Sequence, residues 1–200
     1  MAQITTGTEH AEPTVATPLP LALGTFALTT AILGSIFSGF IVPSISAGMS
    51  LLAAVAFFGG LVQLLVGMWE LRQDNMPTGT IFASYGGFLM AFGVIMAPSL
   101  GILNALGSVM HPALGLFFLA WTIFTAILFL SSLRMNVALV ITLALLFLSY
   151  LLLTIGELAG GSATILMIGG WLGILTGLVA WYTAFAGLLS AGKGVFHLPV

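Results

Sequence analysis

Six stretches of almost uninterrupted apolar sequence, each about 20 residues long, constrain this chain more than any other feature. Inside a lipid bilayer every backbone polar group must pair within the protein, which leaves only helices or a closed barrel. A barrel would require short segments in which polar and apolar residues alternate. We therefore predict an all-α membrane protein with six transmembrane helices, at residues 21–42, 47–69, 78–96, 112–130, 136–155 and 164–190.

The scarcity of charge excludes the common soluble classes. Only 4% of the residues are Asp, Glu, Lys or Arg, whereas soluble domains have about 25%. A soluble fold of this composition would expose large apolar patches and aggregate. Three basic residues cannot form a phosphate-binding surface, so no nucleic-acid partner is expected. Without cysteine there is no disulfide or thiolate metal site, and we expect no cofactor and no bound metal.

Three cations predict the orientation of the chain. With six spans, Arg72 in the second loop, Arg134 in the fourth loop and Lys193 after the last span share the side of both termini. Cytoplasmic loops carry an excess of Lys and Arg, so both termini are predicted to be cytoplasmic. Residues 1–17 lack the basic start and apolar middle of a signal peptide. We expect a mobile tail at 1–17, the membrane domain at 18–192 and a short tail at 193–200.

Small residues at four-residue spacing predict close packing between helices, because they let two backbones approach in lipid. Packing within one protomer is the favoured interpretation of these stripes, and a pore wall or an interface between protomers are the alternatives. The stripes are Gly59–Gln63–Gly67, Ala83–Gly87–Ala91 and Gly169–Gly173–Gly177. The longest connection, residues 98–111, is expected to be an irregular lid or a short interfacial helix.

Neutral polar residues are informative because no charge falls inside any predicted span. Gln63 lies near the middle of the second span, where an amide needs hydrogen-bond partners. It either links two helices or faces a polar path and donates to a solute. Tyr85 lies mid-span, away from the interfacial belt that explains most membrane tyrosines. Thr29 and Thr30 raise the same choice, although threonines often bond to their own helix backbone.

Two acidic residues lie at the ends of predicted spans and are candidates for a proton or charge role. Glu70 is expected to pair with Arg72 or Arg134. Glu157 stands alone on the opposite side, where it either attracts protons or is solvated. The predicted spans contain no Ser-His-Asp set, paired carboxylates or zinc-ligand spacing, so enzyme activity is not expected.

Two stretches of the sequence are distinctive. The first is Ala-Thr-Pro-Leu-Pro-Leu-Ala-Leu at residues 16–23. The second combines Gly59-Gly60 and Gln63 with Glu70 and with Ser84-Tyr85-Gly86. Together they resemble the acetate uptake transporter family, also called the succinate–acetate permeases, which has Asn-Pro-Ala-Pro-Leu-Gly-Leu in place of the first stretch. The resemblance implies six-helix protomers that assemble as hexamers, with one path in each protomer. It also implies movement of acetate, related short monocarboxylates and sometimes succinate, by proton symport or as a channel.

The resemblance also implies roles for individual residues. Phe26, Tyr85 and Leu146 would form a narrow apolar constriction. The residues near the bound carboxylate would be Gln63, Tyr85, Thr29, Thr30, Thr17 and Pro18. Thr17 replaces the family's asparagine, so a carboxamide contact is lost or replaced by a hydroxyl, and the substrate range does not follow from the resemblance.

The spans hold no cation that could bind a carboxylate by charge, and a naked anion is costly to desolvate. We therefore expect acetate to cross the plasma membrane together with a proton. A channel for a small neutral solute, such as urea or an amide, is the first alternative. A membrane scaffold or sensor that transports nothing is the second.

Overall fold

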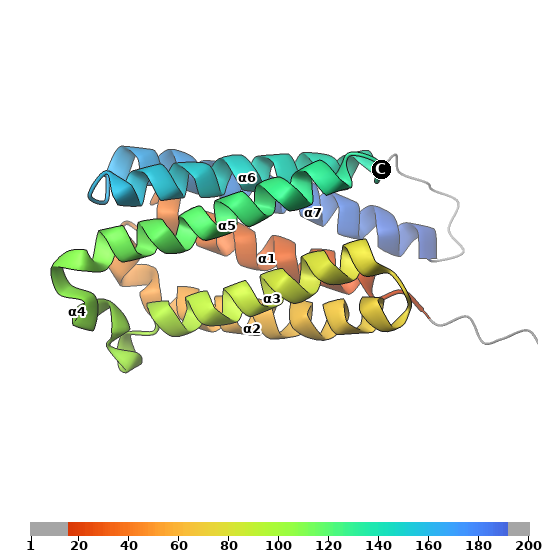
Figure 1. The fold of residues 1–200 in the computed structure, drawn as a ribbon, viewed down its shortest axis with the longest axis horizontal. Helices are drawn as coiled ribbons and strands as arrows, with labels where there is room; N and C mark the ends of the chain where they lie inside the picture. Colours follow the sequence, from red (N-terminus) through yellow and green to blue (C-terminus); the bar gives the residue numbers. More distant parts are fainter. Residues whose placement is uncertain (1–15, 192–200) are drawn as a thin grey trace, which may run out of the picture.

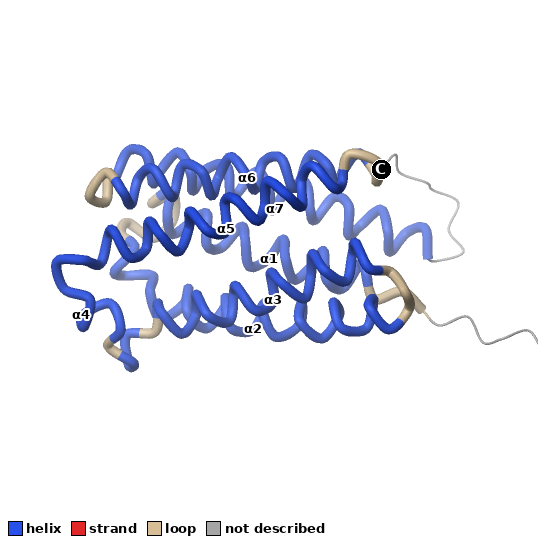
Figure 2. Tube along the Cα trace, in the orientation of Figure 1, coloured by secondary structure: helices blue, strands red, loops and turns tan. Residues whose placement is uncertain are grey.

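The computed structural model describes residues 16–191, and the regular structure of that segment is entirely helical (Figures 1 and 2). The predicted tails at 1–17 and 193–200 lie almost wholly outside it. Six long helices are long and apolar enough to cross a membrane, which confirms the predicted number of spans. They are α1 (Leu19–Ser38), α2 (Ile45–Arg72), α3 (Met76–Met96), α5 (Met110–Ser132), α6 (Val137–Leu158) and α7 (Ala163–Ala191).

The connection between α3 and α5 contains the short helix α4 (Ile102–Leu106), flanked by the 3-10 turns η1 (Pro98–Leu100) and η2 (Gly107–Val109). This agrees with the prediction of a short helix there. Pro98 starts η1, and Gly101 and Gly107 take positive φ angles of 66° and 52° at the breaks, a backbone region that glycine adopts without a Cβ clash.

Helix ends depart from the predicted ends for identifiable reasons. The α1 helix stops at Ser38, short of the predicted residue 42, because Gly39 takes a left-handed conformation and its N–H caps the last turn. The α2 helix begins early, at Ile45, where the Ser44 side chain accepts the N–H of Ala47. It also ends late, at Arg72 and not at the predicted residue 69, so Glu70 lies in its last turn.

The long helices run alternately in opposite directions, and their packing forms a closed circuit. The α1 helix packs on α7 and α2, α2 packs on α3, α5 packs on α6 and α6 packs on α7, while side chains of α3 and α5 close the circuit. We call the end with Leu19 and Ala191 the proximal end. The distal end, at the left of Figure 1, carries the α1–α2 connection, α4 and the α6–α7 turn.

Glycines bring α7 directly against α1. A Cβ on Gly34 would lie 2.6 Å from the Gly170 carbonyl oxygen, and one on Gly177 would lie 2.9 Å from the Ala27 carbonyl oxygen. Real Cβ atoms do not approach backbone so closely, and in lipid such contact is a main source of helix association. The glycines of the last span therefore pack within the protomer, as the favoured interpretation predicted.

The contact between α2 and α3 uses a different glycine from the predicted one. A Cβ on Gly86 would lie 2.8 Å from the Gly60 carbonyl oxygen, whereas Gly87 is exposed and has no atom near its Cβ position. Ala83 does contact Gly67, but Ala91 is exposed. At Gly87 and Ala91 the stripe therefore does not pack within the protomer, because one residue rotates a helix by about 100°, and the alternative of an interface between protomers stays open for these two positions.

Candidate solute path

Three cavities lie within the bundle and share walls with one another. An open cavity of about 620 Å³ occupies the distal end, and we call it the distal vestibule. A central cavity of about 30 Å³ shares Phe37 with it, and a proximal cavity of about 10 Å³ shares Phe26 and Tyr85 with the central one. The shared side chains are therefore the walls that interrupt a path through the protomer.

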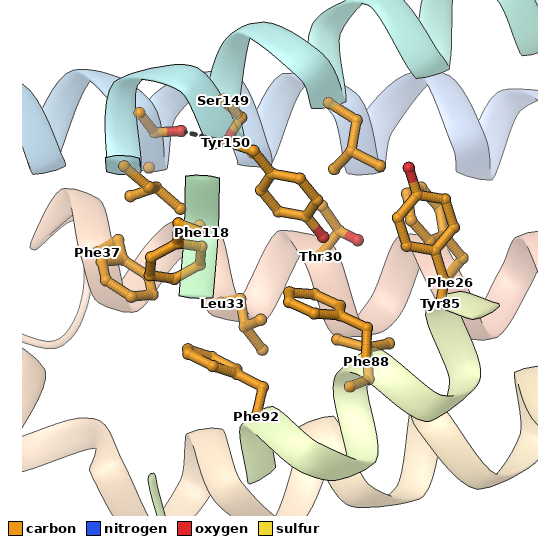
Figure 3. A pocket seen from close by; sticks show the side chains of 17 residues that line it. Phe26, Thr30, Leu33, Phe37, Tyr85, Phe88, Phe92, Phe118, Ser149 and Tyr150 are labelled. Carbon is orange, nitrogen blue, oxygen red and sulfur yellow. Dashed lines mark hydrogen bonds between the residues drawn. The ribbon is translucent and has the colours of Figure 1, made fainter. Parts of the chain in front are cut away.

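Aromatic rings from four helices, α1, α3, α5 and α6, line the central cavity (Figure 3). The ring centroid of Phe88 lies 5.3 Å from that of Tyr150 and 5.9 Å from that of Phe92, and Phe92 lies 5.6 Å from Phe118. Such tilted and stacked pairs pack tightly. The wall of the cavity is therefore largely aromatic and apolar.

Four residues that line the central cavity carry a hydroxyl group: Thr30, Tyr85, Ser149 and Tyr150. The Ser149 hydroxyl donates a hydrogen bond to the Gly169 carbonyl oxygen at 2.8 Å, so its proton is not available to a solute. The Tyr150 hydroxyl points towards Thr30 in Figure 3. Thr30 and Tyr150 are therefore the hydroxyls best placed to contact a solute in the cavity.

Phe26, Tyr85 and Leu146 come together at the proximal wall of the central cavity. All three side chains are buried, and the rings of Phe26 and Tyr85 are 6.2 Å apart. The Tyr85 hydroxyl donates a hydrogen bond to Oγ1 of Thr125, in α5, at 2.8 Å. Tyr85 consequently presents its ring to the path, and this arrangement supports the predicted constriction.

The path is closed here. The central cavity of about 30 Å³ and the proximal cavity of about 10 Å³ are separate, and the side chains of Phe26 and Tyr85 lie between them. Side chains of the wall must therefore rotate before a solute passes.

The two candidate threonines of α1 lie in different places. Thr30 lines the central cavity. Thr29 donates to the Thr25 carbonyl oxygen at 2.8 Å, and a Cβ on Gly59 would contact its side chain. Thr29 therefore bonds to its own helix and packs against α2, outside the three cavities.

Gln63 is completely buried where α2 meets α1 and α3. On its helix it lies between Gly59, which faces Thr29, and Gly67, which faces Ala83. Within the described residues neither atom of its amide has a hydrogen-bond partner. The predicted hydrogen-bonded link between helices is therefore absent from residues 16–191. Gln63 also does not line the three cavities.

Glu70 is buried at the proximal end and is held by neutral donors. Its side chain is 1% exposed, and its carboxylate accepts hydrogen bonds from the Thr17 hydroxyl at 3.1 Å and from the Asn75 amide. The expected pairing with Arg72 or Arg134 is not found among the described residues. Thr17 also accepts the N–H of Leu19 at 3.3 Å. Thr17 therefore connects the start of α1 to the end of α2, and Pro18 is the N-cap residue of α1.

Glu157 lies inside α6 and is not a solvated residue. Its carboxylate lies 2.8 Å from His111 Nδ1, and both residues line the distal vestibule. Like Glu70 in α2, it lies in the last turn of its helix, so both carboxylates are at the span ends where the sequence predicted them. Both carboxylates are buried by partners that are distant in sequence.

The sequence matches the profile of the GPR1/FUN34/yaaH family over residues 2–200. The chain belongs to this family. Among curated members it is 36% identical to acetate permease A of Emericella nidulans, over 92% of this chain and 65% of that protein. It is 31% identical to the succinate-acetate/proton symporter SatP of Escherichia coli K12, over 93% of this chain and 95% of that protein. The chain thus spans just under two thirds of the fungal relative and nearly all of the bacterial one.

A solved family structure described as the bacterial acetate channel SatP superposes on this chain with a TM-score of 0.81. The two are 30% identical, and the match covers 93% of this chain and 99% of that one. The family and the six long apolar helices establish a multi-pass membrane protein. The family match agrees with the resemblance that the sequence shows around Gln63 and Tyr85.

Sequence reasoning missed two residues of the path in this family member. Tyr150 lies only five residues before the end of a predicted span, where an interfacial tyrosine is the default interpretation, yet it lines the central cavity. His111 falls in the connection between two predicted spans, yet it contacts Glu157. The adjacent Pro112 marks a helix start, which would have placed His111 at the mouth of the bundle.

Proposed function

We propose that this chain conducts acetate and related short monocarboxylates, with succinate as a further candidate, across the plasma membrane together with a proton. The observation that carries the proposal is the lining of the central and proximal cavities. It consists of aromatic and aliphatic side chains and a few hydroxyl groups, without any charged residue. A wall of this kind favours a small solute that carries no net charge while it crosses. Relatives named as an acetate permease and a succinate-acetate/proton symporter support the choice of solute.

The geometry suggests an order of events. The solute enters the distal vestibule, passes Phe37 and reaches the central cavity, where Thr30 and Tyr150 replace part of its hydration. Rotation of Phe26, Tyr85 and Leu146 then opens the way to the proximal cavity. An acid molecule crosses at lower cost than its anion, because no cation in these cavities compensates for the lost water.

Gln63 is proposed to act when the wall moves. Its amide is buried and unpaired among the described residues, and an unpaired buried amide costs about 1–3 kcal/mol. Hydrogen bonding to a carboxyl group would recover that free energy. Gln63 lies next to the α1 helix that carries Phe26 and Thr30, so a small shift of α1 would expose the amide to the path.

Further proposals concern the surroundings of the protomer. Arg72 and Arg134 are exposed at the proximal end, which supports a cytoplasmic location for that end and for both termini. Lys193 lies outside the described residues. Large apolar side chains are exposed on the outer faces of the bundle, among them Leu65, Ile123 and Leu178. These faces suit lipid or neighbouring protomers, and a hexamer is the proposed assembly.

Uptake into proteoliposomes tests the proposed function. Labelled acetate should enter vesicles that contain the protein faster than protein-free vesicles, and unlabelled acetate in excess should suppress the signal. Uptake of labelled urea that excess urea suppresses and excess acetate does not would favour the neutral-solute channel. Absence of any flux, with folded protein in the membrane, would favour the scaffold or sensor.

Shortening Leu146 tests the constriction. Leu146→Ala is expected to raise uptake of butyrate relative to acetate by about threefold or more, because truncating a buried leucine leaves space that a longer chain occupies. Leu145→Ala, a neighbouring leucine that lines none of the three cavities, serves as the control. An unchanged butyrate-to-acetate ratio in Leu146→Ala would remove Leu146 from the constriction.

A further inference from the structure

His111 and Glu157 meet on the wall of the distal vestibule. His111 lies in the first turn of α5 and Glu157 in the last turn of α6, with 2.8 Å between Nδ1 and Oε2. The Glu157 side chain is 4% exposed, whereas that of His111 is 39% exposed. The carboxylate is therefore sheltered, and the imidazole is the member of the pair that an entering solute can reach.

The turn between α6 and α7 fixes the imidazole in place. Gly160 and Gly161 both have positive φ angles, of 77° and 80°, which favour glycine. A Cβ on Gly161 would lie 2.8 Å from His111 Nε2, so the glycine lets the turn pack directly against the ring. This turn thus positions His111 beside Glu157.

Among residues 16–191, this pair alone determines the charge of the vestibule wall. The other polar side chains that line it are neutral: Ser38 from α1, Ser44 and Ser46 from the start of α2, and Asn104 from α4. The lining residues of α3 and α7 are apolar or small. With a neutral imidazole the wall carries one negative charge, which opposes an entering anion. With an imidazolium its net charge is zero.

We propose that His111 and Glu157 form a proton-carrying recognition site for small carboxylates at the distal mouth of the path. This inference rests on the proposed function and adds where the proton is bound. When the imidazolium forms, its Nδ1–H donates to Glu157 and its Nε2–H is the donor left for the carboxylate of the solute. Such charge-assisted hydrogen bonds are the stronger kind, and histidine changes charge near neutral pH.

Proton transfer within this site balances. The Nε2–H bond breaks as an O–H bond forms on the solute carboxylate, which yields a neutral acid and a neutral imidazole that still donates Nδ1–H to Glu157. The neutral acid then meets the uncharged central cavity. The imidazole regains a proton from the water of the vestibule, and the site is ready for another solute molecule.

The test is equilibrium exchange of labelled acetate and of labelled formate in proteoliposomes, with the same pH on both sides so that no gradient drives the flux. Formic acid is the stronger acid. If the site supplies the proton, the native chain should show the same half-maximal pH for both solutes. If the acids take up their protons in bulk water, the half-maximal pH of formate should be the lower one.

Glu157→Gln keeps an acceptor for His111 Nδ1–H but removes the charge, so a purely structural link between α5 and α6 would survive. In this variant only acid formed in bulk water remains as a substrate, and the half-maximal pH values of the two solutes should separate. If Glu157→Gln fails to fold, His111→Gln takes its place, and the half-maximal pH values of the two solutes should separate in that variant too. Asp74→Asn removes an exposed carboxylate at the proximal end and should keep the native profile.

Three results would overturn the inference: separate half-maximal values in the native chain, an unchanged common value in folded Glu157→Gln, or a folded variant without exchange at any pH. A native chain that exchanges neither acid would instead overturn the proposed function itself.

Discussion

Gln63→Met is expected to reduce acetate uptake by about tenfold or more while leaving the protein as stable as the native chain, or more stable. Methionine matches the length of glutamine and carries no group that requires a hydrogen bond. The native amide is fully buried without a partner among the described residues, so its removal relieves a desolvation cost of about 1–3 kcal/mol. Loss of function without loss of stability is the signature of a group retained for the solute.

The measurement combines proteoliposome uptake with thermal unfolding in detergent. Gln73→Met is the matched control, because Gln73 is exposed at the end of the same helix, and it should change neither quantity. If Gln63→Met lowers the unfolding temperature and leaves uptake per folded protein unchanged, the amide has a structural role and the proposal for Gln63 is wrong.

Gly86→Ala is expected to destabilise the protein severely, whereas Gly87→Ala, one residue later, should have almost no effect. A Cβ on Gly86 would lie 2.7 Å from Leu64 Cα and 2.8 Å from the Gly60 carbonyl oxygen, but one on Gly87 meets nothing within 4 Å. The Gly86 contacts are with backbone, which cannot yield without moving α2 away from α3. Overpacking of this kind costs about 1–3 kcal/mol or more.

Thermal unfolding and the yield of folded protein after purification report the effect. The two variants make the same chemical change in the same helix, so any difference between them comes from the contact with α2. Equal stability of the two variants would contradict the close approach of α2 and α3. A strong loss in Gly87→Ala alone would show that its outward face is packed in the assembled protein.

The spans were predictable because a run of about 20 apolar residues has few alternatives in lipid. Their ends near Glu70 and Glu157 were not, because a carboxylate in an otherwise apolar run is ordinarily taken as the end of the span. Each of these buried carboxylates makes a hydrogen bond to a partner that is far away in the sequence. Glu70 accepts from Thr17, 53 residues away, and Glu157 contacts His111, 46 residues away. Such pairings depend on the order of helices around the bundle.

The candidate site was likewise predictable in part: the sequence identified some of its residues and missed others. Residue type identified Gln63 as a polar group at depth, and the family resemblance identified Phe26, Tyr85 and Leu146, which the structure brings together. Residue type could not separate Thr29 from Thr30, because two adjacent residues differ only in the direction they face on a helix. The relation of Tyr150 to the central cavity likewise depends on the rotation of α6, which no periodicity in an almost uniformly apolar helix reveals.

The central claim, that a carboxylate crosses together with its proton, is tested most directly by the pH inside proteoliposomes. Vesicles with a trapped pH-sensitive dye and a clamped membrane potential receive an inward acetate gradient. Vesicles without protein give the background of acid that crosses the lipid. Vesicles with the native protein should acidify faster than this background, with acidification in step with the entry of labelled acetate. Faster entry of labelled acetate without faster acidification would show that the anion crosses alone and would contradict the claim.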